Sequence, residues 1–262
     1  MKYLITGASS GIGKALAYEA AKNKNDLVLV ARRKDKLEEI KTELSISYDI
    51  SVEVLIADLT IEEEIKKVIK YIENNSIEVL INNAGFGSSG PFVEIDIENE
   101  LNEIDLNVRA LVQLTHVAAK IMAEKKYGTI VNISSIASYQ PMVGNATYGA
   151  TKAFVTSFTH AISQELNSYG VKVLLVCPGL TKSEFFSRSM WFDATSTESY
   201  LPKLLWKKPE TVAKKIIKSV ENGRSVLIPG LVNKIFAFVS SSLPGNFKKK
   251  ITAVVAKGSR TR

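Results

Sequence analysis

The sequence predicts an α/β fold, with a mostly parallel sheet and helices on both of its faces. The first observation is a regular alternation, in which apolar runs of strand length are separated by amphipathic stretches of helix length. Such alternation is typical of parallel sheets joined by right-handed crossovers. The second observation is a glycine-rich turn directly after the first apolar run, at the edge where open α/β sheets bind their ligands.

Seven apolar runs fit buried strands, because each is short, rich in Val, Leu and Ile, and bounded by polar residues or glycine. They occupy residues 3–6, 26–31, 51–56, 77–82, 129–133, 171–176 and 225–228. The expected helices occupy residues 14–23, 34–46, 61–75, 96–125, 148–169 and 211–222. The helix at 148–169 has more apolar positions than one core-facing stripe requires, so we expect it to pack against a second subunit.

The length and composition suit one globular domain, since the chain has 262 residues, of which 45% are hydrophobic and 23% charged. We expect a single domain over residues 1–230, followed by a basic and apolar tail at 231–262 whose packing the sequence leaves open. That tail could lie on a membrane surface, but packing on its own domain is the favoured interpretation.

Segment 180–208 is irregular and rich in Phe, Trp and Ser, and we expect it to be a substrate-binding loop. Its larger aromatic side chains either line an apolar pocket or pack onto the body of the domain. They are Trp191, Phe192 and Trp206.

Several classes of protein are disfavoured by simple features of the chain. The single Cys177 excludes an intramolecular disulfide and fits a reducing compartment. The N-terminus enters a strand at once, and no apolar run reaches the length of a membrane span. We therefore expect a cytoplasmic protein. His116 and His160 are isolated from acids and thiols, so no metal site is expected. The net charge is +7, but the sequence has no motif of basic and aromatic residues for binding nucleic acid. We therefore expect no nucleic acid as a partner.

The glycine-rich turn reads Thr6-Gly7-Ala8-Ser9-Ser10-Gly11-Ile12-Gly13 and lies between a strand and a helix. Glycines permit a tight turn and a close approach of backbone to a pyrophosphate, and the helix N-terminus supplies free N–H groups. The second strand then ends in Ala31-Arg32-Arg33, where an NAD-binding unit carries a carboxylate for the ribose 2′-hydroxyl. Guanidinium groups match a 2′-phosphate instead, which favours NADP(H) over NAD(H).

Tyr148 and Lys152 stand four residues apart, so on a helix their side chains share one face. An ammonium group beside a phenol favours the phenolate, and we expect it to lower the tyrosine pKa from about 10 towards neutral. A tyrosine tuned in this way can act as a general acid or base.

Together these features resemble the short-chain dehydrogenase/reductase family over about residues 3–183. The shared motifs are Thr6-Gly7-x-x-x-Gly11-x-Gly13, Asp58, Asn82-Asn83-Ala84-Gly85, Asn107, Ser135, Tyr148-x-x-x-Lys152 and Pro178-Gly179. All seven stand in the order that the family has. The resemblance implies a Rossmann-like, doubly wound parallel sheet of about seven strands, and a homodimer or homotetramer packed through two long helices.

The resemblance also implies which part of the cofactor each residue would bind. Arg32 would bind the 2′-phosphate, and Asp58 and Leu59 would flank the adenine. Pro178, Gly179 and Thr181 would hold the nicotinamide amide, with Ser183 as the alternative partner. The pyrophosphate and the two riboses would contact Gly7, Ser9, Ser10, Gly11, Ile12, Gly13, Asn83, Ala84, Gly85, Tyr148 and Lys152.

The implied reaction is hydride transfer between NADPH and a carbonyl or secondary alcohol, with Ser135, Tyr148, Lys152 and Asn107 as the catalytic residues. Ser135 is preferred to Ser134 because the family places its serine thirteen residues before the tyrosine. Asn107 would hold a water that links Lys152 to solvent. The alternatives are a non-catalytic NADP-binding regulator and a dehydratase or epimerase that retains its NAD. The substrate is expected to be a small carbonyl or alcohol compound, with a hint of hydrophobic character.

Overall fold

The computed structural model describes residues 1–182 and 206–242. Its sheet has seven strands, all parallel, in the order β3-β2-β1-β4-β5-β6-β7. The doubly wound α/β architecture that the sequence predicts is therefore confirmed. The strands are β1 (Lys2–Thr6), β2 (Asp26–Ala31), β3 (Val52–Ile56), β4 (Val79–Asn82), β5 (Gly128–Ile133), β6 (Val171–Val176) and β7 (Val226–Leu227).

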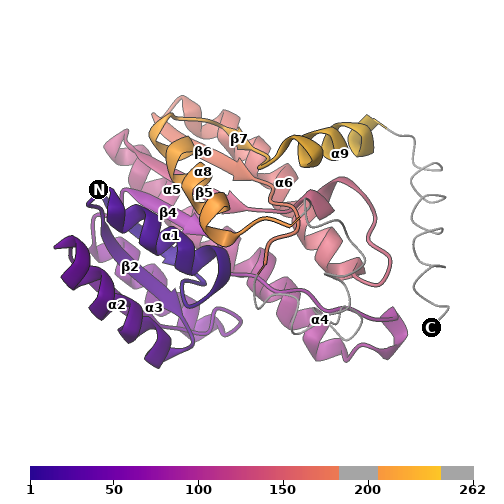
Figure 1. Cartoon of the computed structure of the whole chain (residues 1–262), viewed down its shortest axis with the longest axis horizontal. Coiled ribbons are helices and arrows are strands. Elements are labelled where there is room, and N and C mark those ends of the chain that lie inside the picture. The colour runs from indigo at the N-terminus through magenta and orange to yellow at the C-terminus, as the bar shows by residue number, and fades with distance from the viewer. Residues whose placement is uncertain (183–205, 243–262) are drawn as a thin grey trace.

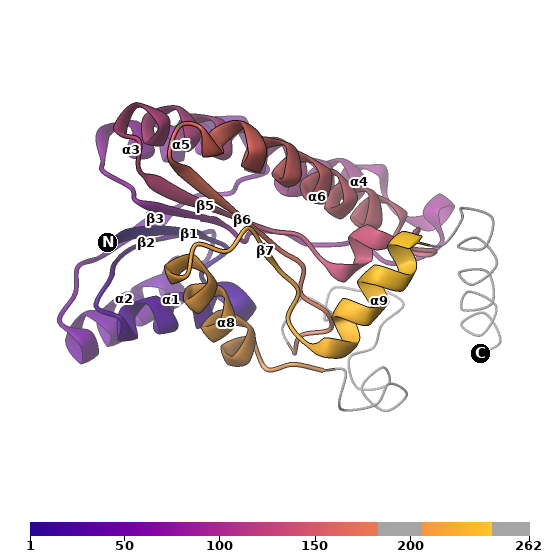
Figure 2. The same cartoon turned by 90° about the horizontal axis from the view of Figure 1, so that it is seen from above.

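Helices cover both faces of this sheet (Figures 1 and 2). One face carries α1 (Gly11–Lys22), α2 (Lys34–Tyr48) and α8 (Pro209–Glu221). The opposite face carries α3 (Glu62–Asn74), α4 (Ile97–Ile104), α5 (Leu111–Lys125) and α6 (Ala146–Asn167). Short 3-10 turns, η1 (Phe92–Glu94) and η3 (Ile136–Tyr139), lie in the connections.

The core is split into two apolar layers by the sheet itself. In β2, Leu27 and Leu29 face the layer under α1 and α2, whereas Val28 and Val30 face the layer under α3 and α5. All four side chains are completely buried. Burying a side chain of this size stabilises the fold by about 1.5–3 kcal/mol, which explains why these strands read as continuous apolar runs rather than as alternating ones.

Two helix predictions differ from the structure by more than two residues at an end or in their continuity. Helix α1 begins at Gly11, three residues earlier than expected, because sequence patterns place glycines outside helices. The single helix expected at 96–125 is α4 and α5 joined by a π-helical turn, η2 (Asp105–Ala110). A π turn is a single widened turn within a helix and is common at functional sites. It contains Asn107.

The two ends of the expected substrate-binding loop lie side by side. Thr181 and Lys207 form a parallel bridge, with Lys207 N donating to Leu180 O at 2.9 Å. Trp206 is buried there. Trp191, Phe192 and the other residues from 183 to 205 lie outside the described residues.

Part of the expected tail is a helix, α9 (Leu231–Ser242). Its Asn233 packs against Gly179, while Leu231 and Phe238 are each 73% exposed. Within the described ranges, no helix is both long and apolar enough to cross a membrane.

Candidate active site

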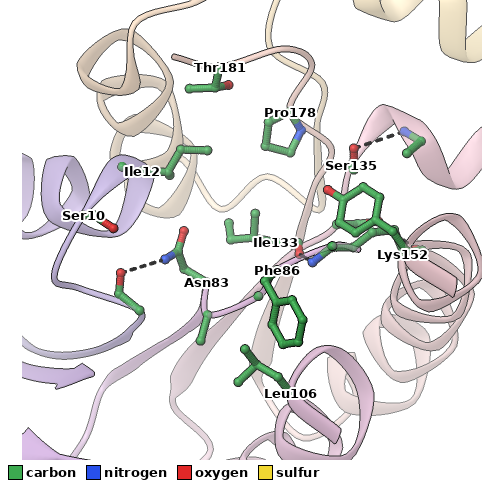
Figure 3. Close-up of a pocket in the computed structure, with 18 of the residues that line it drawn as sticks. Ser10, Ile12, Asn83, Phe86, Leu106, Ile133, Ser135, Lys152, Pro178 and Thr181 are labelled. Carbon is green, nitrogen blue, oxygen red and sulfur yellow. Dashed lines mark hydrogen bonds between the residues drawn. The ribbon is translucent and has the colours of Figure 1, made fainter. Parts of the chain in front are cut away.

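A cavity of about 570 Å³ opens at the carboxyl ends of the parallel strands, a size typical of small-molecule sites. Figure 3 shows Ser10 and Ile12 of the glycine loop on one side of it, Ser135 and Lys152 on the other, and Asn83 between them. The predicted site residues that line it are Gly7, Ser9, Ser10, Gly11, Ile12, Arg32, Asp58, Leu59, Asn83, Ala84, Gly85, Ser135, Tyr148, Lys152, Pro178, Gly179 and Thr181.

Three predicted residues are not part of this lining as described. A Cβ at Gly13 would lie 2.2 Å from the carbonyl oxygen of Gly7, so Gly13 allows α1 to pack against the loop. Asn107 is buried behind the cavity wall. Ser183 lies outside the described residues, so only Thr181 can be placed. Its hydroxyl donates to Gly179 O at 3.0 Å.

Hydrogen bonds join the end of β1 to the loop after β4 beside the cavity. Gly7 has a φ of +66°, a left-handed conformation that favours glycine, and a Cβ there would lie 2.9 Å from Ala84 Cα. The Asn83 side-chain amide donates to Thr6 O at 2.9 Å, and Thr6 Oγ1 accepts from the backbone N–H groups of Asn83 and Ala84 at 3.0 Å. These contacts fix the glycine loop against the loop after β4.

Two guanidinium groups stand at the end of β2. Arg32 Nη1 lies 3.2 Å from Asp58 Oδ2, while Arg33 donates from Nε and Nη2 to Ser9 Oγ at 3.1 and 2.9 Å. Partial burial opposes ionisation of Asp58, but hydrogen bonds from Thr60 and Arg32 hold the pKa of its carboxyl below the usual range. Both arginines line the cavity, so the site offers positive charge at two adjacent points.

Tyr148 lies in the first turn of α6, and Lys152 follows one turn later. The Lys152 ammonium lies 5.7 Å from the centre of the Tyr148 ring and donates to Ile133 O at 3.1 Å. Ser135 lies at the end of β5, and Ser135 Oγ accepts from Ala137 N at 3.1 Å. Ser134 is instead buried, and its hydroxyl donates to Lys152 O at 2.8 Å. Both serines line the cavity, but the hydrogen bond with the Tyr148 side chain comes from Ser135, whereas the Ser134 hydroxyl is bonded to the backbone of α6.

The expected lowering of the tyrosine pKa is not found. Burial raises the pKa of Tyr148 to about 12, although a hydrogen bond with Ser135 partly opposes this rise. Burial likewise lowers the pKa of Lys152 to about 8. Both residues lie in a poorly solvated site, where the charged form of each is penalised. The raised pKa favours the protonated phenol at neutral pH.

Asn107 is held by hydrogen bonds within the protein. Its side-chain nitrogen donates to Phe86 O at 2.8 Å and to Thr151 Oγ1 at 3.1 Å, and its oxygen accepts from Phe86 N at 3.2 Å. The side chain thus fixes the loop that follows Gly85. A Cβ at Gly85 would lie 3.2 Å from Lys152 Nζ, so this loop packs directly against the lysine.

Sequence reasoning missed Arg33 and the residues at the far end of the cavity. The Arg32-Arg33 doublet was the available signal for Arg33. The far end had no motif, because its residues come from separate loops and from α9. They are Phe86, Gly87, Ser89, Gln140, Met142, Asn145, Leu180 and Phe236.

Comparison with known proteins identifies the family. The model of the short chain dehydrogenase family matches residues 2–190. The NADP-dependent 3-hydroxy acid dehydrogenase of Schizosaccharomyces pombe is 34% identical over 229 residues, which cover 86% of this chain and 88% of that protein. The very-long-chain 3-oxoacyl-CoA reductase of Bos taurus is 30% identical over 265 residues, which cover 99% of this chain and 80% of that protein.

A solved structure gives the same result. The short-chain dehydrogenase from Sphingobium yanoikuyae in complex with NADPH superposes with a TM-score of 0.82 at 32% identity. The match covers 100% of this chain and 96% of that one. The chain belongs to the short-chain dehydrogenase family and is an oxidoreductase.

Proposed function

We propose that this chain interconverts a carbonyl and a secondary alcohol with NADP(H), and that Tyr148 is its general acid and base. The observation that carries the proposal is the shared cavity. Ser135, Tyr148 and Lys152 line one part of it, and the glycine loop with two arginines lines another. A nucleotide held by the loop would bring its nicotinamide towards the three side chains.

The chain's residues fit NADP(H) in shape and charge. The glycine loop leaves backbone room for a pyrophosphate at the start of α1, where the helix dipole favours negative charge. Arg32 and Arg33 offer guanidinium groups to a 2′-phosphate, beside the hydroxyl of Ser9. The dependence on NADP in the name of the yeast relative, and the NADPH in the Sphingobium structure, support this choice.

NADPH supplies the hydride when bound, and the protein positions and protonates the substrate. Ser135 donates a hydrogen bond to the carbonyl oxygen. Tyr148 transfers its proton to that oxygen as negative charge develops there. Lys152 supplies positive charge beside the resulting phenolate, which would otherwise be costly in this poorly solvated place. In the reverse direction, the phenolate accepts the proton of the alcohol.

The far end of the cavity favours a substrate with an apolar part. Phe86, Met142, Leu180 and Phe236 contribute apolar side chains, while Gln140 and Asn145 contribute amides. A ketone carrying a hydrocarbon or acyl chain fits this combination. The 3-oxoacyl-CoA named for one relative is a ketone of that type, and the 3-hydroxy acid named for another is an alcohol that gives a 3-oxo acid on oxidation.

The experiment is a carbonyl panel followed by NADPH absorbance, with simple ketones, 3-oxo acids and 3-oxoacyl thioesters of increasing chain length. We expect consumption of free NADPH with at least one chain-bearing 3-oxo compound, and faster turnover than with short ketones. A regulator that only binds NADP would consume none across the panel. An enzyme that retains its nucleotide would convert a substrate without any change in NADPH.

We also propose a homo-oligomer that buries an apolar surface on α4 and α6. Ile97, Leu101 and Ile104 of α4 are 59%, 46% and 41% exposed, and Phe154 of α6 is 42% exposed and stacks on Phe158. The two helices pack against each other. Light scattering should give at least twice the mass of one chain, and a monomer throughout the micromolar range would reject this assembly.

A further inference from the structure

Glu103 is a buried carboxylate directly behind the candidate active site. It lies in the last turn of α4 and has no exposed surface. Its Oε2 accepts hydrogen bonds from Ser88 N and Ser88 Oγ, both at 2.7 Å. Its Oε1 is also buried and accepts no hydrogen bond from any residue in 1–182 or 206–242. Burying a charged group with an unpaired oxygen is costly, so this position needs an explanation.

The loop that Glu103 holds is the one that packs on the catalytic side chains. A Cβ at Gly87 would lie 2.8 Å from Tyr148 Cδ2, and one at Gly85 would lie 3.2 Å from Lys152 Nζ. The backbone at 85–88 thus forms the wall against which both side chains rest. Asn107 fixes this wall at Phe86, and Glu103 fixes it at Ser88.

The charges around Glu103 come from two packed helices. Glu100 lies on α4 itself, and its carboxylate accepts a hydrogen bond from the Thr147 hydroxyl of α6. Lys152 lies on α6, and its positive charge favours the ionised form of Glu103. On balance, burial raises the pKa of Glu103 to about 7, with hydrogen bonds from Ser88 opposing the rise and Glu100 adding to it.

The same carboxylate acts on both catalytic residues. Next to the dominant effect of burial, the negative charge of Glu103 raises the pKa of Lys152, and it also raises that of Tyr148. Cys177 is the other acidic group that faces this pair, and burial raises the pKa of its thiol, so it stays neutral at working pH. The negative charge of Glu103 and the positive charge of Lys152 therefore favour one another.

We propose that Glu103 is a positioning residue for the reaction proposed above: its buried carboxylate holds the 85–88 loop against Tyr148 and Lys152 and places a negative charge on the far side of that loop. The inference rests on that proposed function for its catalytic meaning, but not for its charge coupling. Glu103→Gln has the same shape and can still accept from Ser88, yet it has no charge. Ser88→Ala is the matched control, because it removes one hydrogen bond and leaves the carboxylate and the Ser88 N–H in place.

The first measurement is a pH titration of Lys152 by NMR in protein labelled with ¹³C at the lysine ε-carbon, with Lys152→Met to assign the signal. In the unsubstituted protein we expect a midpoint near 8, well below those of exposed lysines. In Glu103→Gln the midpoint should fall by about half a unit or more, because the neighbouring anion is gone. In Ser88→Ala it should fall by less, because the carboxylate and one of its two hydrogen bonds remain.

The second measurement is the pH profile of turnover. Carbonyl reduction needs protonated Tyr148, so the rate is lost as pH rises through the pKa of the group, and Glu103→Gln should lose it at lower pH. Alcohol oxidation needs the phenolate and should begin at lower pH in the same variant. Glu103→Asp, which restores the charge, should return both profiles towards those of the unsubstituted protein.

Specific results would overturn the proposal. A Lys152 midpoint that is unchanged in Glu103→Gln, or that moves equally in Ser88→Ala, would show that the charge has no role of its own. A lower turnover number with an unchanged pH profile would reduce Glu103 to a purely structural group. If no substrate is turned over, the proposed function fails, while the lysine titration still decides the charge coupling.

Discussion

Replacing Tyr148 by Phe should lower kcat by about 10²–10⁴-fold, the usual contribution of a positioned general acid. The substitution removes one oxygen atom and keeps the ring that packs against Gly87. The remaining hydrogen bond from Ser135 orients the carbonyl but cannot supply a proton to the new alkoxide. NADPH affinity should change little, because the glycine loop and the arginines are untouched. Stopped-flow turnover and fluorescence titration with NADPH measure the two quantities separately.

Tyr139→Phe is the matched control for this prediction. It removes the same atom from a tyrosine of η3 whose hydroxyl lies 3.7 Å from Cys177 Sγ, outside the cavity lining. Its turnover should stay close to that of the unsubstituted protein. Full activity in Tyr148→Phe would remove the proposed acid, and an equal loss in both variants would point to general damage to the fold around η3 and α6.

Replacing Arg33 by Ala should weaken NADPH binding by about 10–100-fold, as expected for the loss of one hydrogen bond to a charged group, worth about 1.5–3 kcal/mol. Arg32→Ala should have a smaller effect, because its guanidinium is half exposed and shared with Asp58. NADH affinity should be nearly unchanged in both variants, since NADH has no 2′-phosphate. Titration with both nucleotides therefore reports the phosphate contact itself.

Arg109→Ala serves as the control for net charge. Arg109 lies on the π turn, beside Glu62 and Asp105, and does not line the cavity. Its loss lowers the protein charge by the same amount and should leave NADPH affinity within about twofold, as is usual for a screened surface charge. A parallel loss of NADH and NADPH affinity in Arg33→Ala would contradict the 2′-phosphate assignment and indicate a disturbed glycine loop.

The fold could be predicted because each of its elements is encoded by a short, continuous stretch of sequence. Each strand is a short, buried apolar run, and each run is followed by the loop that carries a site residue, such as Gly7, Asp58 or Asn83. Parallel strands bring these loops to one edge whatever their order in the sheet. The order itself is set by packing between distant segments, and it was not predicted from the sequence.

The features that escaped prediction depend on burial and on chain direction. Arg32 and Arg33 are neighbours at the end of a strand, where successive side chains diverge, so one meets Asp58 and the other Ser9. In the sequence, Glu103 is a charged residue on an expected helix, which predicts a solvent-exposed side chain. In the structure it is buried beneath the 85–88 loop. The π turn cannot be distinguished from an α-helix by apolar spacing.

The prediction of a lowered Tyr148 pKa was wrong because it, too, depends on burial. Spacing places Lys152 one turn from Tyr148, but it says nothing about water. In the structure burial raises the pKa of Tyr148, and the nearby ammonium is directed to Ile133 O. A protonated phenol is the form that the proposed reduction of a carbonyl needs.

The most direct test of the central claim, hydride transfer from NADPH with protonation by the protein, uses NADPH carrying deuterium at the transferable C4 position. The carbonyl compound that is turned over fastest in the panel is reduced, and its product is examined by mass spectrometry and NMR. We predict one deuterium on the carbinol carbon of each product molecule, with the hydroxyl proton drawn from solvent. A product without deuterium, formed while NADPH is left unconsumed, would contradict the account.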